Sequence, residues 1–86
     1  MAAVEIYTSP FCGFCFRAKA LLKGKGIDYT EIDVMMSPSK RKEMTERAGT
    51  RSVPQIFVDG EHLGDCDHIY DLEQRGELEA ALGVGG

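Results

Sequence analysis

Apolar and polar residues along the first third of the chain form three patterned runs. Val4–Thr8 alternates apolar and polar positions and predicts a strand. The next run is spaced like one face of a helix, and its apolar residues are Cys15, Ala18, Leu21 and Leu22. This helix is expected to begin near Gly13 and to end near Lys23. Asp28–Asp33 then predicts a second strand, parallel to the first because a helix crosses over between them.

A second helix is expected between Ser37 and Gly49, and its capping residues indicate it more clearly than its periodicity does. Ser37 is a good N-cap, Pro38 suits the first helical position, and Gly49 is a common C-terminal stop. Only Met44 and Ala48 form an apolar face. The other positions carry a mainly basic cluster that we expect to be solvated, made of Lys40, Arg41, Lys42, Glu43, Glu46 and Arg47.

Two short strands and a final helix complete the pattern. Gln55–Val58 and Glu61–Leu63 flank an Asp-Gly pair, which is typical of the tight turn of a β-hairpin. From Asp67 onward, apolar residues recur at helical spacing and continue past Gly76: Ile69, Tyr70, Leu72, Leu78 and Leu82. We therefore expect one final helix. The predicted order is βαβαββα, an α/β fold.

A cysteine pair, Cys12-Gly13-Phe14-Cys15, lies where the first strand gives way to the first helix. The unpaired backbone N–H groups and the positive dipole end of that helix favour the thiolate of Cys12 over its thiol. Cys15 lies one turn further along the same face, so its sulfur can approach that of Cys12. We predict redox chemistry with Cys12 as the nucleophile and Cys15 as the resolving thiol. Phe14 is either a spacer or an apolar wall beside the thiols.

Two other interpretations of the cysteine pair explain the sequence less well. A structural disulfide across two residues closes almost no loop, so it would stabilise the fold little. A zinc site needs four ligands, and beyond the pair the chain offers only Cys66, His62 and His68. The chain has three cysteines, an odd number that does not suit a disulfide framework. Free thiols in a reducing compartment agree with this count.

Composition limits the size and the partners of the protein. The 86 residues, 43% of them hydrophobic, suffice for one modest core, so we expect residues 1–86 to form a single domain. The net charge of −4 argues against nucleic acid as the main partner. No apolar run reaches membrane length, and the first residues lack the features of a secretory signal. We therefore expect a cytoplasmic protein without a membrane partner.

Three motifs together resemble the glutaredoxins, a family with the thioredoxin-like fold, over nearly the whole chain. They are Tyr7–Cys15 with Ala18-Lys19, Ser52–Phe57, and Gly64–Asp67. The chain is most similar to the small bacterial-type dithiol glutaredoxins. This resemblance implies a four-stranded mixed sheet flanked by helices. It also implies glutathione-dependent reduction of protein–glutathione mixed disulfides and of protein disulfides.

The resemblance further implies where glutathione would bind. The Val53-Pro54 peptide bond would be cis and would place the Val53 main chain beside Cys12. At the third motif, backbone N–H groups opening the last helix would meet the α-carboxylate of the γ-glutamyl group, and Asp67 its ammonium. The alternative for Asp67 is a simple N-cap, a role that can coexist with a ligand contact. The Cys66 thiol is expected to be a small buried or half-buried side chain rather than a catalytic one. The implied glutathione-binding residues are Phe14, Ser52, Val53, Pro54, Gly64, Cys66 and Asp67.

The sequence departs from the family pattern at three positions near this site. Asp65 stands in place of a glycine and His68 in place of an aspartate, which weakens the expectation of tight glutathione binding. Ser9 stands where the family often has a lysine that holds the glycine carboxylate of glutathione. The cations that could substitute for this lysine are Arg17, Arg41, Arg47 and Arg51.

Two roles follow from the resemblance. In the first, the Cys12 thiolate attacks a protein–glutathione mixed disulfide, and a second glutathione restores Cys12, while Cys15 resolves protein disulfides. In the second, the protein carries a [2Fe–2S] cluster between two chains, each giving Cys12, with two glutathiones giving the other thiolates. Gly13 motivates the second role, because the more common dithiol motif has proline there. Cys15 counts against it, because dedicated cluster carriers have serine at that position.

The first role predicts a monomer, whereas the second predicts a cluster-bridged dimer. Apart from Cys12 in that dimer, no metal ligand is assigned. A thioredoxin reduced by a reductase is a third alternative. It would require a tryptophan before the cysteine pair, and the chain contains none.

Overall fold

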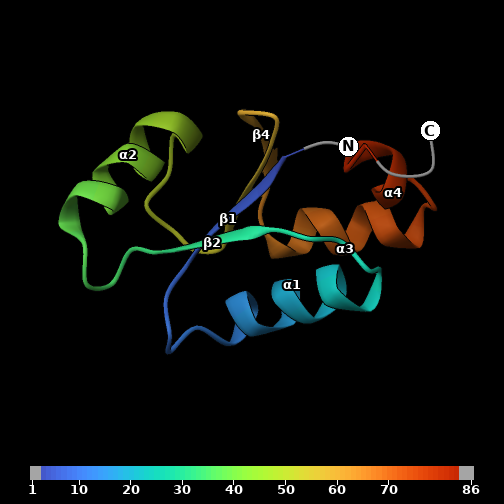
Figure 1. Ribbon diagram of the computed structural model, residues 1–86, viewed down its shortest axis with the longest axis horizontal. Coiled ribbons are helices and arrows are strands. Elements are labelled where there is room, and N and C mark those ends of the chain that lie inside the picture. Colours follow the sequence, from blue (N-terminus) through green and yellow to red (C-terminus); the bar gives the residue numbers. More distant parts are fainter. Residues whose placement is uncertain (1–2, 84–86) are drawn as a thin grey trace.

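A computed structural model describes residues 3–83 and shows a four-stranded mixed sheet with helices on both faces (Figure 1). The strands are β1 (Val4–Thr8), β2 (Thr30–Asp33), β3 (Gln55–Val58) and β4 (Glu61–Gly64). Their order in the sheet is β2-β1-β3-β4; β1 is parallel to β2, and the other pairs are antiparallel. The helices are α1 (Gly13–Gly24), α2 (Pro38–Ala48), α3 (Cys66–Gln74) and α4 (Leu78–Ala81). The expected sheet flanked by helices is confirmed.

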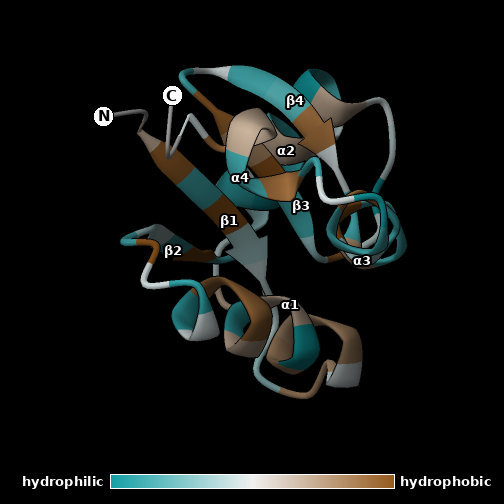
Figure 2. Ribbon diagram, turned by 90° about the vertical axis from the view of Figure 1, so that its right-hand side faces the viewer, coloured by the Kyte–Doolittle hydropathy of each residue, from teal (hydrophilic) through white to brown (hydrophobic). Residues whose placement is uncertain are grey.

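The helices pack on the sheet in two groups, because alternate residues of a strand face opposite sides. Figure 2 shows this alternation of hydrophobic and hydrophilic residues along β1. One face, covered by α1, α3 and α4, forms the larger core of Val4, Ile6, Ala18, Leu22, Ile27, Ile56, Cys66, Ile69, Leu78 and Leu82. The other face, under α2, buries Tyr7, Val34, Met44 and Phe57. Within residues 3–83, every helix is too short or too polar to span a bilayer.

The predicted element boundaries hold closely where turn and cap residues marked them. Ser37 caps α2 through its hydroxyl, which accepts the Lys40 N–H at 3.4 Å. Gly49 ends α2 in the left-handed conformation, with φ of 75°. The strand expected over Asp28–Asp33 begins two residues late, at Thr30, and β4 extends one residue further than expected, to Gly64.

The expectation of one final helix is wrong, because the chain forms two helices on either side of Gly76. Gly76 has φ of 73°, a left-handed conformation that a continuing α-helix excludes. Leu78 and Leu82 nevertheless lie in the same core as α3, which explains why the apolar periodicity continued through the break. Lys25, at the end of α1, joins the two helices by ion pairs to Glu73 at 2.6 Å and to Glu79 at 2.7 Å.

The expectation that the basic cluster of α2 is simply solvated is also wrong for one residue, Arg47. Its guanidinium lies 4.0 Å from the centroid of the Phe57 ring and donates to the Tyr7 hydroxyl at 2.7 Å. It also pairs with Glu5 at 3.4 Å. The aliphatic stem and the planar charge of arginine suit such a half-buried position over aromatic rings. Arg47 therefore helps to attach α2 to the sheet.

Two glycine substitutions test whether the chain breaks between α3 and α4 at Gly76. One replaces Gly76, which has a positive φ, and the other replaces Gly24, which is helical. Gly76→Ala should lower the free energy of unfolding by about 1 kcal/mol, because alanine is strained at positive φ. Gly24→Ala, at the end of α1, should raise it by about 0.5 kcal/mol, because the residue is helical there. Neither added methyl would meet another atom within 4 Å. Urea denaturation measures both changes, and equal effects of the two substitutions would contradict the assignment of two helices.

Candidate active site

Cys12 occupies the N-cap position of α1 and uses its sulfur as the capping acceptor. Its backbone is extended, with φ of −112° and ψ of 110°. The Cys15 N–H donates to Sγ of Cys12 at 3.1 Å, and the Phe16 N–H donates to the Cys12 carbonyl at 3.1 Å. A serine or aspartate oxygen usually accepts such a bond. This N–H and the positive end of the helix dipole both point towards the Cys12 sulfur.

The segment before β3 brings a carbonyl to the same sulfur. Sγ of Cys12 lies 3.7 Å from the carbonyl oxygen of Val53, which follows it by 41 residues. The Val53-Pro54 peptide bond is cis, as expected. Cys12 is half-buried between these two segments, so its sulfur meets the protein on two sides and remains partly open to solvent.

Cys15 lies in a very different environment from Cys12, although both are reduced. It is only 1% exposed, on the inward face of α1. Burial, and then the neighbouring Cys12 sulfur, raise the pKa of the Cys15 thiol to about 12. Cys15 is therefore a protonated thiol at neutral pH.

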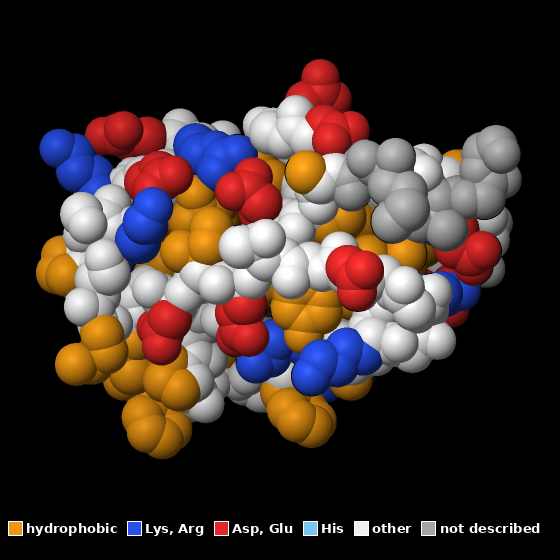
Figure 3. Space-filling view, in the orientation of Figure 1, with side chains coloured by type: hydrophobic (Ala, Val, Ile, Leu, Met, Phe, Trp, Pro, Cys, Tyr) orange, Lys and Arg blue, Asp and Glu red, His pale blue; other side chains and the backbone are white. Residues whose placement is uncertain are grey.

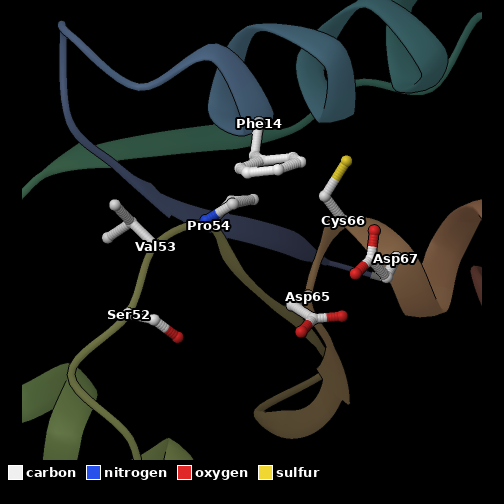
Figure 4. A pocket seen from close by; sticks show the side chains of 7 residues that line it. All are labelled: Phe14, Ser52, Val53, Pro54, Asp65, Cys66 and Asp67. Atoms are coloured by element: carbon white, nitrogen blue, oxygen red, sulfur yellow. The ribbon is translucent and has the colours of Figure 1, made fainter.

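Val53, whose carbonyl contacts Cys12, also lines a groove of about 180 Å³ (Figure 4). Phe14 reaches into it from α1, Val53 and Pro54 border it from the loop before β3, and Cys66 and Asp67 open α3 on the other side. The structure thus brings together six of the seven residues predicted to bind glutathione: Phe14, Ser52, Val53, Pro54, Cys66 and Asp67. Gly64 does not line the groove, whereas Asp65, which the sequence-based prediction omitted, does.

Asp65 is the N-cap of α3, which makes the alternative interpretation of Asp67 as the cap wrong. The Asp65 carboxylate accepts the His68 N–H at 3.0 Å, and Asp67 lies within the first turn. An aspartate three residues before His68 is a recognisable capping signal, so the sequence held this information. Asp65, which stands where the family pattern has a glycine, therefore stabilises the start of α3, the helix that borders the groove.

Gly64 has a steric reason to be glycine. Its φ is 147°, and a Cβ at this position would lie 2.7 Å from the His68 ring. A side chain at Gly64 would therefore collide with His68, the other departure from the family pattern. Gly64 acts on the groove indirectly, by letting the chain turn from β4 into α3 beside this imidazole.

Cys66 lines the groove but is a poor nucleophile. It is 3% exposed, and burial raises the pKa of its thiol, with Asp67 and Asp65 adding to the rise and Arg17 opposing it. In Figure 4 its sulfur points towards α1. This agrees with its expected role as a small buried side chain. The guanidinium of Arg17 is itself held 5.2 Å from the Tyr70 ring centroid.

Among residues 3–83, no arginine or lysine lines the groove. Of the four arginines considered as partners for a carboxylate, Arg47 packs over the Phe57 ring and Arg17 over the Tyr70 ring. Arg41 donates to the Arg51 carbonyl at 2.9 Å. Arg51 directly precedes Ser52, a residue of the groove lining. Its contact with Arg41 therefore lies close to the groove.

Large hydrophobic side chains are exposed on both sides of the cysteine pair. Phe11 is 86% exposed and Phe16 is 71% exposed, and Met36, in the loop after β2, is 85% exposed. Figure 3 shows hydrophobic side chains protruding along the edge of the molecule where Figure 1 places α1. Exposed aromatic side chains of this size around a reactive group suit contact with another macromolecule.

The fold and the cysteine pair define the class of this protein. A reduced dithiol begins a helix after the first strand of a thioredoxin-like sheet, with an accessible sulfur at the cap and a buried one a turn later. This arrangement is that of a thiol–disulfide oxidoreductase.

Comparison with known proteins identifies the family within this class. The glutaredoxin family model matches residues 4–63. Glutaredoxin 3 of Escherichia coli (strain K12) is 49% identical over 82 residues, which cover 95% of this chain and 99% of the relative. The chain belongs to the glutaredoxin family, as a small bacterial-type member.

Solved structures agree with this assignment. The solution structure of glutaredoxin from Brucella melitensis is 48% identical, with a TM-score of 0.86, over 100% of this chain and 94% of that one. The crystal structure of a buckwheat glutaredoxin–glutathione complex is 27% identical, with a TM-score of 0.84, over 95% of this chain and 77% of that one. The thioredoxin-like fold predicted from the sequence is confirmed.

The different environments of the three thiols predict selective alkylation. At pH 8, iodoacetamide should modify Cys12 at least about 100-fold faster than Cys15 or Cys66, because those thiols are buried and their pKa values are raised. Raising the pH to 10 should leave Cys15 mostly unmodified, because with a pKa of about 12 only about 1% would be thiolate. Mass spectrometry of tryptic peptides measures each site. In guanidinium chloride all three should react alike, and fast labelling of Cys66 in the native protein would contradict this prediction.

Proposed function

We propose that this protein is a glutathione-dependent oxidoreductase that reduces protein–glutathione mixed disulfides through the Cys12 thiolate. The observation that carries the proposal is the contact between Sγ of Cys12 and the Val53 carbonyl, at the border of the groove. A disulfide bound along this groove would have a sulfur beside Cys12. The similarity to a glutaredoxin determined in complex with glutathione supports the same ligand.

The polar groups of the groove match the γ-glutamyl end of glutathione. The Asp65 cap takes up the His68 N–H, so the first-turn amides of Cys66 and Asp67 are the donors that a ligand carboxylate could meet. The Asp67 carboxylate could pair with the ammonium of the same group. Asp65 adds a second negative charge there, which favours the ammonium and opposes the carboxylate.

The first half-reaction needs only Cys12. Its thiolate attacks the glutathione sulfur of the mixed disulfide, a new sulfur–sulfur bond forms between Cys12 and glutathione, and the target protein leaves as a thiolate. A second glutathione thiolate then attacks the glutathione sulfur bound to Cys12. This step releases oxidised glutathione and restores the Cys12 thiolate, so two glutathione molecules become one disulfide.

Cys15 would take part only with protein disulfides. Cys12 first forms a mixed disulfide with the substrate. The Cys15 thiol then gives up its proton to water, its thiolate attacks the Cys12 sulfur, and the substrate leaves as a thiolate that takes up a proton. The resulting Cys12–Cys15 disulfide is reduced by glutathione. Because burial holds the pKa of Cys15 near 12, its thiol stays protonated and does not compete with the first half-reaction.

The surroundings of Cys12 also favour macromolecular substrates over free glutathione disulfide. Exposed side chains on either side of the cysteine pair are large and apolar, with Phe11 at 86% and Phe16 at 71% exposed. These side chains lie where a protein attached to the leaving sulfur would meet the surface. Their burial against a substrate would add to binding without contacting the glutathione moiety.

Serine variants of the two cysteines test this mechanism. Cys12→Ser should lose glutathione-dependent reduction of a small glutathione mixed disulfide by at least about 1,000-fold, because the nucleophile is gone. Cys15→Ser should retain at least about half of this activity and lose the reduction of protein disulfides. Coupling the reaction to glutathione reductase and following NADPH oxidation measures both. Strong activity of Cys12→Ser would overturn the assignment of the nucleophile.

A bridging [2Fe–2S] cluster is a second candidate function. The structure of a poplar glutaredoxin C1 in its holo form resembles this chain at 29% identity, with a TM-score of 0.85. Gly13 leaves open space beside Cys12, because a Cβ there would have no neighbour within 4 Å. Among residues 3–83, no three His, Cys, Asp or Glu side chains are grouped to hold a metal. A cluster would therefore need Cys12 from two chains and two glutathione thiolates.

Anaerobic reconstitution with iron, sulfide and glutathione tests the second candidate. A cluster between two chains should give a brown protein that elutes as a dimer and separates into monomers when the cluster is lost. Cys12→Ser should abolish both the colour and the dimer, whereas Cys66→Ser should keep them. A colourless monomer after reconstitution would leave the oxidoreductase as the one function supported.

A further inference from the structure

Gln55 is a buried polar side chain at the start of β3, and both ends of its amide are bonded. The residue is 2% exposed. Its amide nitrogen donates to the Ser52 carbonyl at 3.0 Å and approaches the Ser52 hydroxyl at 3.2 Å. Its amide oxygen lies 2.6 Å from Nε2 of His62. Because a buried amide without partners is costly, these contacts hold the side chain in one orientation.

His62 supports this amide from the neighbouring strand. It lies on β4 opposite Phe57, and its ring packs on the Phe57 ring with the centroids 5.1 Å apart. The nitrogen of the Gln55 amide faces Ser52, so its oxygen faces His62 and must accept a hydrogen. In this orientation of the amide, the His62 ring meets the Gln55 oxygen through Nε2. A chain of side-chain contacts thus runs from β4 through β3 to the loop before it.

The loop held by this chain carries the contact to the nucleophile. Gln55 and Ser52 flank Val53 and Pro54 in sequence, so the amide closes a small ring around the cis peptide bond. The Val53 carbonyl inside this ring lies 3.7 Å from Sγ of Cys12. Any movement of Ser52 would shift the Val53 main chain relative to Cys12 and to the groove.

We propose that Gln55, supported by His62, is a positioning residue that holds the Ser52–Pro54 segment where its main chain meets the substrate beside Cys12. Gln55 does not touch the reacting sulfur and acts through Val53. The proposal rests on the proposed glutathione-dependent reaction and adds a residue to it. If the role of Gln55 were purely structural, its substitution would change the stability of the protein alone. If Gln55 positions the loop, its substitution changes substrate binding, seen in KM, more than turnover, seen in kcat.

Four variants separate these roles by their kinetics with a small glutathione mixed disulfide. Gln55→Leu keeps the side-chain size and removes the amide, so KM should rise about fivefold while kcat changes less than about twofold. His62→Phe keeps a ring on Phe57 and removes the donor, so KM should rise about twofold. Gln74→Leu, at the exposed end of α3, is the matched control and should change neither value. The double variant Gln55→Leu with His62→Phe should match Gln55→Leu, because both residues act through one amide.

Amide hydrogen exchange of Ser52 and Val53, followed by NMR on the same proteins, gives a second measure. Exchange should become faster in Gln55→Leu and His62→Phe and stay unchanged in Gln74→Leu. A lower melting temperature of Gln55→Leu with an unchanged KM would overturn the proposal, and additive effects in the double variant would overturn the role of His62. If the wild-type protein does not turn over the mixed disulfide, the proposed function fails. Exchange then decides the positioning of the loop, and unchanged exchange at residues 52 and 53 would overturn it.

Discussion

The antiparallel pairing of β1 with β3 is the constraint on which the site depends. Tyr7, near the end of β1, pairs with Gln55, the first residue of β3. The C-terminal end of β1 and the N-terminal end of β3 therefore lie side by side. The turn that carries Cys12 and the loop that carries Val53 therefore meet, although 41 residues separate them. A shift of this register by one residue would turn Gln55 to the other face and separate the sulfur from the carbonyl.

The three thiols show how strongly position decides the chemistry of one residue type. Cys12 caps a helix and receives an N–H, Cys15 lies a turn later in the core, and Cys66 opens another helix under the groove. Burial raises the pKa of the latter two, while Cys12 stays partly open to solvent. The dithiol therefore joins one half-buried cysteine at the start of a helix to one fully buried cysteine a turn later.

Sequence patterns predicted most of the fold, because caps and turns are local. The Ser-Pro start of α2, its glycine end and the Asp-Gly hairpin turn appear as expected. The break at Gly76 was missed because α3 and α4 pack on one core, so apolar spacing continued across it. The half-buried place of Arg47 was missed because its partners, Tyr7 and Phe57, lie far away in sequence. Asp65 was missed for a different reason, since its capping signal was present in the sequence.

The sequence by itself determined the dithiol at a helix start, the order of strands and helices as far as α3, and the family, because these depend on neighbouring residues and on motif spacing. Only the tertiary structure decided how far each cysteine is buried, that Asp65 lines the groove whereas Gly64 does not, and that Gln55 and His62 support the loop beside Cys12. These features arise where strands and loops distant in sequence pack together. Local pattern carries no measure of that packing, since burial and distance belong to the folded chain.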